Sequence, residues 1–278
     1  MKRITVIAAL AGAVLLGGGA AWYFTNSGDA SAPRRALLPL PEAATKPAWT
    51  ARVTPLAGDG INGVVDGDSA VSRFSDPFGV VVDVKGNVFI ADGGDSNRIR
   101  RIGADGVVGT YAGGREGFAD GMRETAAFNT PSALALDRAG NLYVADTGNH
   151  AIRKIARDGS VTTLAGDGQP GYLDGIGRTA RFNGPVGVAV DRDGNVFVAD
   201  TYNDRIRRIA PDGAVTTVAG NGRPGAMDGA AATAGFDTPV GIAVDKAGTL
   251  FVADTGNNAV RRIGLDGMVT TVAAPIPG

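Results

Sequence analysis

The feature that most constrains the fold is a repeat of 54 residues. Four copies of a short apolar run close on aspartates at this spacing, namely Asp83, Asp137, Asp191 and Asp245. Nine residues after each of these, a Val/Leu-Phe/Tyr-Ile/Val-Ala run ends on a second aspartate. A fixed period of this size is typical of repeat proteins, in which each copy is one supersecondary unit stacked on its neighbours.

Each copy predicts four short strands, which in the first copy are residues 78–83, 88–91, 98–102 and 107–112. The turn between the first two strands reads Asp-x-x-Gly-Asn in three copies, and Asp-Gly joins the last two, as tight hairpins require. The chain holds 43 Gly but few Glu and Lys, so helices are disfavoured. The sequence therefore predicts an all-β fold, a β-propeller of four four-stranded blades with the first strand innermost.

The repeats divide the folded part into four copies at about 74–127, 128–181, 182–235 and 236–275. One further segment, residues 53–57, resembles the fourth strand of a copy and predicts an extra leading outer strand. It competes with residues 268–273 for the outer position of the last blade. Pro55 cannot donate a ladder hydrogen bond, so we expect the leading segment on an edge. Four copies leave three arrangements open: a small ring, an open arc, or half of an assembly.

Residues 185–201, 205–209 and 215–220 resemble the repeats of NHL-repeat β-propellers, including exported or membrane-anchored bacterial members. The resemblance covers about residues 52–275. It implies a propeller fold. Because such propellers serve as sensor ectodomains, as docking platforms for protein or RNA, and occasionally as enzymes, it does not by itself assign a function.

The N-terminus predicts export. Lys2 and Arg3 precede an apolar, uncharged stretch over residues 4–24, which we expect to form a helix. Residues 1–24 are interpreted as either a cleaved signal peptide or a signal anchor. Residues 25–49, rich in Pro and Ala, predict a linker, and residues 50–278 predict the propeller. We expect the propeller in the cell envelope, on the periplasmic or extracellular side, held to the membrane by residues 4–24.

Composition excludes several classes of function. The net charge of −1 disfavours nucleic acid as a partner. There is no Cys, and His150 is the single His, so sites that need several imidazoles or thiolates are excluded. We expect no catalytic residue and no cofactor. A Ca²⁺ site in the Asp-rich segment 59–68 is a weaker alternative, because its acids do not follow the spacing of an EF-hand loop.

The four copies act as an internal control on function. Residues that recur in every copy are expected to be structural, and they are Asp92, Asp146, Asp200, Asp254, Arg100, Arg153, Arg207 and Arg261. Loop residues that break the repeat on one rim are the binding candidates, and they are Asp95, Ser132, His150, Tyr172, Tyr202, Asp204 and Asn258. Mixed aromatic, polar and charged side chains on one rim suit recognition. The sequence thus predicts a non-catalytic module that binds a protein, peptide or glycan, with self-association as a further possibility.

The alternative function is a periplasmic hydrolase similar to gluconolactonase-type propellers. Those enzymes hold a divalent ion at the propeller axis with Glu, Asn and Asp side chains. Within the predicted propeller this chain has only Glu116 and Glu124, both in one loop. Its repeated aspartates are equivalent in all four copies, whereas one asymmetric site is needed. The sequence therefore favours binding over catalysis.

Overall fold

The computed structural model describes residues 53–274. The expected signal segment and linker, residues 1–24 and 25–49, lie outside the described residues. The chain divides into two units, residues 1–55 and 56–278, and the following account concerns the second. Within the described part of the chain, no helix is both long and apolar enough to cross a membrane.

The second unit consists of four antiparallel sheets, which we number as blades 1 to 4. Blade 1 contains β1 (Gly67–Asp68), β2 (Pro77–Val82), β3 (Val88–Asp92), β4 (Arg98–Ile102) and β5 (Val107–Gly113). Blade 2 contains β6 (Gly121–Met122), β7 (Pro131–Leu136), β8 (Leu142–Asp146), β9 (Ala151–Ile155) and β10 (Ser160–Ala165). Blade 3 contains β11 (Gly175–Ile176), β12 (Pro185–Val190), β13 (Val196–Asp200), β14 (Arg205–Ile209) and β15 (Ala214–Ala219). Blade 4 contains β16 (Gly229–Ala230), β17 (Pro239–Val244), β18 (Leu250–Asp254), β19 (Ala259–Ile263) and β20 (Met268–Ala273).

The four long strands of each blade follow the predicted order, but each sheet has a fifth strand. In blade 1 the order is β1-β5-β4-β3-β2, and the other blades repeat it. The added strand is two residues of the loop that leads into the blade, and it pairs with the outer long strand, as Gly67 does with Val108. Two residues are too few to show an alternating pattern, so the sequence did not reveal this strand.

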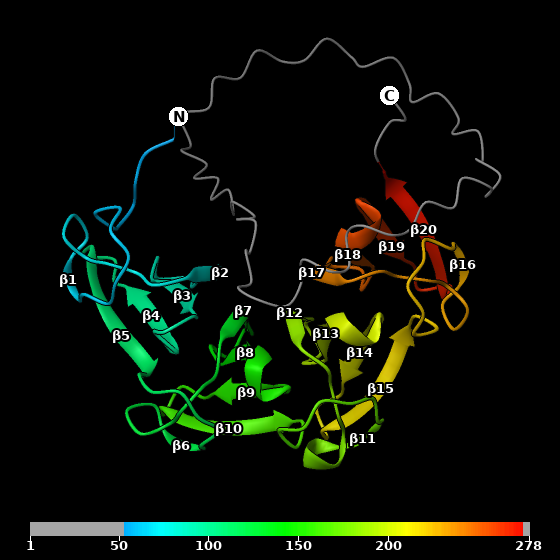
Figure 1. Ribbon diagram of the computed structural model, residues 1–278, viewed down its shortest axis with the longest axis horizontal. Helices are drawn as coiled ribbons and strands as arrows, with labels where there is room; N and C mark the ends of the chain where they lie inside the picture. Colours follow the sequence, from blue (N-terminus) through cyan, green and yellow to red (C-terminus); the bar gives the residue numbers. More distant parts are fainter. Residues whose placement is uncertain (1–52, 275–278) are drawn as a thin grey trace, which may run out of the picture. The chain divides into compact units, whose positions relative to one another are not determined.

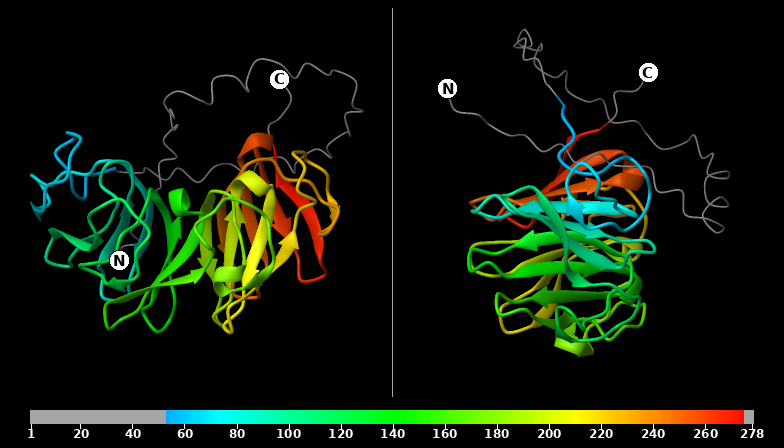
Figure 2. Two further views of the ribbon diagram at one scale, coloured as in Figure 1. Left: turned by 60° about the horizontal axis from the view of Figure 1, so that its bottom comes forward. Right: turned by 90° about the vertical axis from the view of Figure 1, so that its left-hand side faces the viewer.

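The innermost strands of successive blades pack side by side, β2 against β7, β7 against β12 and β12 against β17. The four blades form an arc, with blade 1 and blade 4 at its ends (Figure 1). Further views show the same order of sheets (Figure 2). Among the described strands no comparable packing joins β2 to β17. The apolar core therefore lies between successive blades, where for example Phe89 and Ala91 of blade 1 join one cluster with Leu134 of blade 2.

The two end blades expose faces that the inner blades bury. Val80 of β2 is 38% exposed, whereas Leu134, at the same position of blade 2, is 6% exposed. Phe251 of β18 is 37% exposed, whereas Phe197 in blade 3 is 8% exposed. The first two long strands of a blade are therefore buried on a given face only where a neighbouring blade covers that face.

The leading segment, residues 53–57, forms no strand, which corrects the expected extra outer strand. The outer position of blade 4 is held by β20, which pairs with β19 along Val260–Ile263. A short Asp-Gly turn joins these two strands, so their pairing costs little chain entropy. Pro55 lacks the N–H that a ladder needs, and Val53 is 89% exposed.

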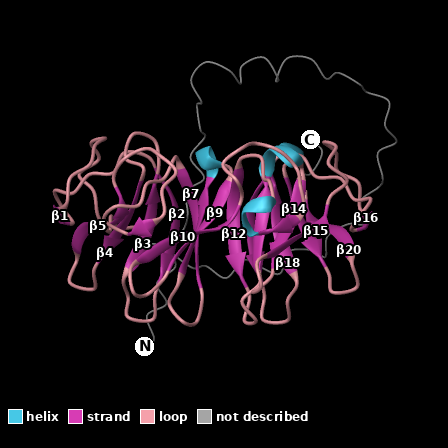
Figure 3. Ribbon diagram, turned by 90° about the horizontal axis from the view of Figure 1, so that it is seen from below, coloured by secondary structure: helices cyan, strands magenta, loops and turns pink. Residues whose placement is uncertain are grey.

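The loops separate onto two sides of the blades (Figure 3). On one side, which we call the rim, lie the long loops between blades and the loops joining the second and third long strands. Three of the latter begin with short 3₁₀ turns, at Thr147–Asn149, Thr201–Asn203 and Thr255–Asn257. On the opposite side, which we call the turn face, lie the tight hairpin turns.

Candidate binding surfaces

Each blade contains one buried arginine held between two carboxylates. In blade 3, Arg207 is fully buried, and its Nη1 lies 2.7 Å from Oδ2 of Asp200. Its Nη2 lies 2.6 Å from Oδ1 of Asp174 in the preceding loop. The same arginine donates to the carbonyl oxygens of Arg181 and Leu173. It therefore fastens the long rim loop to the strands of its blade. The equivalent buried pairs are Arg100–Asp92, Arg153–Asp146 and Arg261–Asp254.

The buried aspartates also cap the rim loops. Asp146 accepts hydrogen bonds from the backbone N–H of Asn129, from Nδ2 of Asn149 and from Arg153. Burial raises the pKa of Asp146 to about 6, against the lowering effect of Arg153 and these donors. Burial likewise raises the pKa of Asp200. These contacts give the repeated Asp and Arg residues internal partners in all four blades.

In blades 1, 2 and 3, the last residue of the loop joining the second and third long strands binds the next blade. Nδ1 of His150 accepts a hydrogen bond from the N–H of Gly184, at 2.9 Å. Oδ1 of Asp204 accepts from the N–H of Thr238, at 2.9 Å. Both residues have left-handed backbones, with φ of 49°. Burial lowers the pKa of His150 and raises that of Asp204. Two rim candidates thus join neighbouring blades.

Ser132 also lies at a blade junction. It is buried, its Oγ lies 2.6 Å from Oγ1 of Thr147, and it donates to the carbonyl oxygen of Val186 in blade 3.

Asn258 occupies the position of His150 in blade 4 and is exposed. Asp95 is also exposed, in the loop of blade 1.

Blade 3 presents the two exposed tyrosines of the candidate set. Tyr172 is 45% exposed and Tyr202 is 56% exposed. The guanidinium of Arg205 lies 3.8 Å from the centroid of the Tyr172 ring. Tyr202 lies over Gly184, where an added Cβ would meet its ring. Both tyrosines come from rim loops, so the structure brings this part of the candidate set onto one blade.

Within residues 53–274 no group of three or more His, Cys, Asp or Glu side chains is arranged to hold a metal ion. In the Asp-rich segment considered for Ca²⁺, Oδ2 of Asp59 pairs with Arg73 and Asp66 pairs with Arg100. The hydrolase alternative and the Ca²⁺ alternative both stay hypotheses.

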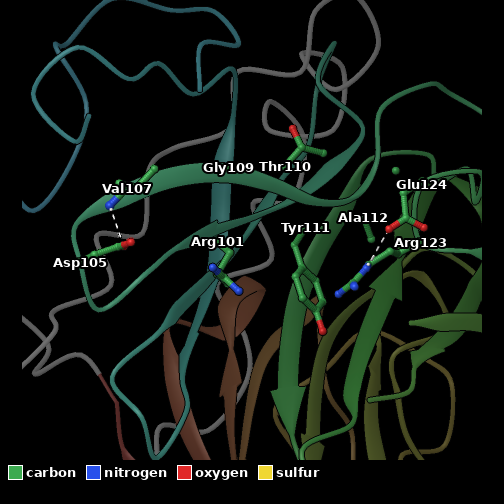
Figure 4. A pocket seen from close by; sticks show the side chains of 10 residues that line it. Arg101, Asp105, Val107, Gly109, Thr110, Tyr111, Ala112, Arg123 and Glu124 are labelled. Carbon is green, nitrogen blue, oxygen red and sulfur yellow. Dashed lines mark hydrogen bonds and ion pairs between the residues drawn. The ribbon is translucent and has the colours of Figure 1, made fainter. Parts of the chain in front are cut away.

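Sequence reasoning missed a second surface, a groove between blades 1 and 2 on the turn face. It comprises two adjoining cavities of about 600 and 440 Å³, which share Arg101, Tyr111 and Arg123 as lining residues. The three side chains converge on the larger cavity (Figure 4). A signal was present in the repeat, because Tyr111 and Arg123 replace aliphatic or small residues of the other blades.

Four stacked antiparallel sheets with a repeated buried Asp–Arg pair define a repeat protein of the β-propeller type. The NHL-repeat sequence model matches residues 128–155, 182–209 and 236–263, the corresponding parts of blades 2, 3 and 4. The chain thus carries NHL repeats in a propeller-type array of blades, as its sequence predicted.

Known proteins show similarity over much of this unit. SUPPRESSOR OF QUENCHING 1, chloroplastic, of Arabidopsis thaliana is 31% identical over 232 residues, which are 77% of this chain and 22% of that protein. NHL repeat-containing protein 2 of Bos taurus is 39% identical over 97 residues, 34% of this chain and 13% of that protein. Teneurin-4 of Mus musculus is 28% identical over 231 residues, 71% of this chain and 8% of that protein. The chain thus spans less than a quarter of each of these relatives.

Among solved structures, a streptogramin B lyase superposes with a TM-score of 0.51 at 16% identity, covering 76% of this chain and 58% of the lyase. At this identity the similarity supports the fold alone.

Proposed function

We propose that this chain is an exported, non-catalytic module that binds a protein, peptide or glycan ligand at the rim of blade 3. The observation that carries the proposal is the pair of exposed tyrosines, Tyr172 and Tyr202, on two rim loops of one blade. Tyrosine offers a large contact area and a polar tip at low entropic cost, which suits recognition.

The loops that carry these tyrosines are held in place by hydrogen bonds. The hydroxyl of Tyr172 lies 3.0 Å from Oγ1 of Thr217. Nδ2 of Asn203 donates to the carbonyl oxygen of Gly171, which ties the two loops together. A surface that is already ordered loses little conformational entropy when it binds a ligand.

The partners of the charged side chains support a non-catalytic role. The repeated arginines and aspartates are buried and paired with each other. His150, the single His, uses Nδ1 to join blade 3, and burial lowers its pKa. With Nδ1 accepting this bond, the neutral imidazole carries its proton on Nε2 and has no free lone pair with which to act as a general base.

The repeat supplies substitutions that test the rim without disturbing the blades. Tyr202→Gly introduces the residue that blades 2 and 4 carry as Gly148 and Gly256, and Tyr172→Ala introduces that of Ala226. On peptide and glycan arrays, we expect each to weaken ligand binding about tenfold, as for a central aromatic contact, with little change in Tm. Leu265→Ala, exposed on the turn face, is the control and should bind normally. Unchanged binding by both tyrosine variants, or lactone hydrolysis by the wild type, would refute the proposal.

Export is tested separately. Lys2 and Arg3 before the apolar stretch predict that residues 25–278 leave the cytoplasm. An alkaline phosphatase fused after Gly278 should be active, and a fluorescent protein that matures only in the cytosol should stay dark at the same position. The reverse pattern would place the propeller inside the cell.

A further inference from the structure

We propose that the groove between blades 1 and 2 is a second binding site, which takes an acidic peptide segment in an extended conformation. The groove lies on the turn face, whereas the tyrosines of the proposed rim site lie on the opposite side of the blades. Its cationic residues are Lys85, Arg101, Arg123, Arg138 and Arg157. The proposal stands independently of the rim, because none of these residues contributes to it.

The groove is lined by five cations and four carboxylates, the latter being Asp83, Asp105, Glu124 and Asp137, and most of its cations have no ion-pair partner. Among the described residues, the side chains of Lys85, Arg101, Arg138 and Arg157 form no ion pair, and Arg123 pairs with the exposed Glu124 at 3.0 Å. The carboxylate of Asp83 accepts three hydrogen bonds from its own hairpin turn. Asp137 accepts from Asn141 and from the hydroxyl of Tyr143. The groove therefore presents unpaired positive charge to a ligand.

The other blade junctions carry less of this charge, because they keep cations at the positions of Arg101 and Arg138 but not at the three described next. Where blade 1 contributes Lys85, blades 2 and 3 have Ala139 and Asp193. Where the loop into blade 2 contributes Arg123, the equivalent loops have Gly177 and Ala231, which accept the same backbone hydrogen bond. Arg157 is replaced by Pro211 in blade 3 and by Leu265 in blade 4. Since the other two junctions are built without Lys85, Arg123 and Arg157, the fold does not require these cations.

The same junction has more room than the others. Gly109 of β5 pairs across the sheet with Arg101, and a Cβ built on it would meet no atom within 4 Å. The equivalent positions of blades 2 and 3 carry Thr162 and Thr216, opposite Lys154 and Arg208. The missing threonine side chain leaves space beside the Arg101 guanidinium for a ligand carboxylate.

The surroundings of Tyr111 favour a peptide over a sugar or a nucleobase. The guanidinium of Arg123 lies 5.2 Å from the centroid of its ring, and the ring of Phe89 packs edge-on at 4.9 Å. The ring thus lacks the open face on which sugars and bases stack. The wall of the larger cavity is β5, whose outer edge pairs with β1 at Val107 and Val108, and whose N–H groups at Thr110 and Gly113 bond to Asp66 and to the carbonyl oxygen of Arg123. An extended peptide can therefore lie along this wall through its side chains, with carboxylates placed against the guanidinium groups.

The test uses the full chain and a labelled peptide of alternating Glu and Val, with a Gln–Val peptide as the matched probe. We expect the Glu peptide to bind more tightly, with an affinity that falls as salt rises. Arg123→Ala combined with Lys85→Ala should weaken it about tenfold, and Gly109→Thr alone a few-fold, because both restore residues of the other blades. Lys154→Ala with Arg192→Ala, at the next junction, is the control and should change nothing.

Three results would overturn the proposal. Equal binding of the Glu and Gln peptides would remove the charge argument. Equal weakening by the control pair would mean that net charge, and not this groove, attracts the peptide. Tighter binding of a heparin oligosaccharide that is lost in the same groove variants would assign the site to a glycan. Tyr202→Gly should leave peptide binding unchanged, so a failure here and a failure at the rim remain distinguishable.

Discussion

Removing Asp200 tests how much each blade depends on its buried ion pair. Asp200 is fully buried, and it accepts hydrogen bonds from Arg207, from Nδ2 of Asn203 and from the N–H of Asn183. In Asp200→Ala, the buried guanidinium keeps only Asp174, whose side chain is 44% exposed, as its acidic partner. The N–H of Asn183 loses its acceptor at the same time.

The expected destabilisation follows from those losses. Breaking a buried ion pair by removing one partner costs about 3–5 kcal/mol, because the remaining charge is left uncompensated. The orphaned N–H is part of that cost, since unsatisfied buried donors cost about 1–3 kcal/mol each. For a folded unit of this size, each kcal/mol lowers Tm by about 2–4 °C. We therefore expect Asp200→Ala to lower Tm by roughly 6–20 °C.

Urea unfolding and calorimetry of the purified chain measure this effect. Asp193→Ala is the control, because Asp193 is exposed in a hairpin turn of the same blade and blades 2 and 4 carry Ala139 and Ala247 there. The control should unfold like the wild type. If Asp200→Ala costs less than about 1 kcal/mol, the net value of an ordinary hydrogen bond, the argument for an essential buried pair is wrong.

Three further predictions concern packing, pH and the chain ends. Gly187→Ala should unfold at markedly lower urea concentration, because its Cβ would collide with the carbonyl oxygen of Val240, whereas Gly241→Ala, with no described blade beyond it, should be tolerated. The raised pKa of Asp146 means that the folded state holds this proton up to about pH 6 and the unfolded state only to about pH 4. The stability that this proton contributes is therefore present below pH 4 and lost as pH rises to 6. When pH is lowered from 7 to 4.5, the free energy of unfolding of the wild type should rise relative to that of Asp146→Asn. The opposite trend would mean that Arg153 outweighs burial. Hydrogen exchange should be slow in β20 and fast in the leading segment, and the reverse order would mean that the leading segment holds the outer position.

The fold could be predicted because the same pattern of strands and turns occurs in four copies of the repeat. The hairpin turns fix strand direction, and the alternating aspartates fix where each strand ends, so the four long strands were placed within a residue or two. The fifth strands could not be predicted, because two residues carry no period. The leading segment was misjudged for a different reason: Val53 to Ala57 has the sequence of an outer strand but no described third strand beside it.

The candidate site was harder to predict, since its residues act across blades. His150 and Asp204 occupy the same position in their copies of the repeat but are different residue types. Each accepts a hydrogen bond from a residue 34 positions later in the chain. No local pattern reveals such a bond. The groove left a clearer trace, because Lys85, Arg123 and Arg157 depart from the residues of the other copies, but only the fold shows that they line one junction.

The groove lies at the junction of blades 1 and 2, and the rim site lies on blade 3, which has a neighbouring blade on each side. Oγ1 of Thr201 donates to the carbonyl oxygen of Pro239 across one such junction, whereas the equivalent Thr255 makes no such bond to a described residue. At the other end of the array, in blade 1, the N–H of Asp76 donates to the carboxylate of Asp92, which belongs to the same blade and not to a neighbouring one. In an array whose stability is a sum of repeats and nearest-neighbour interfaces, each end blade lacks one interface and opens first. Side chains that must hold a fixed geometry for recognition are better placed away from those ends, as Tyr202 and Arg123 are.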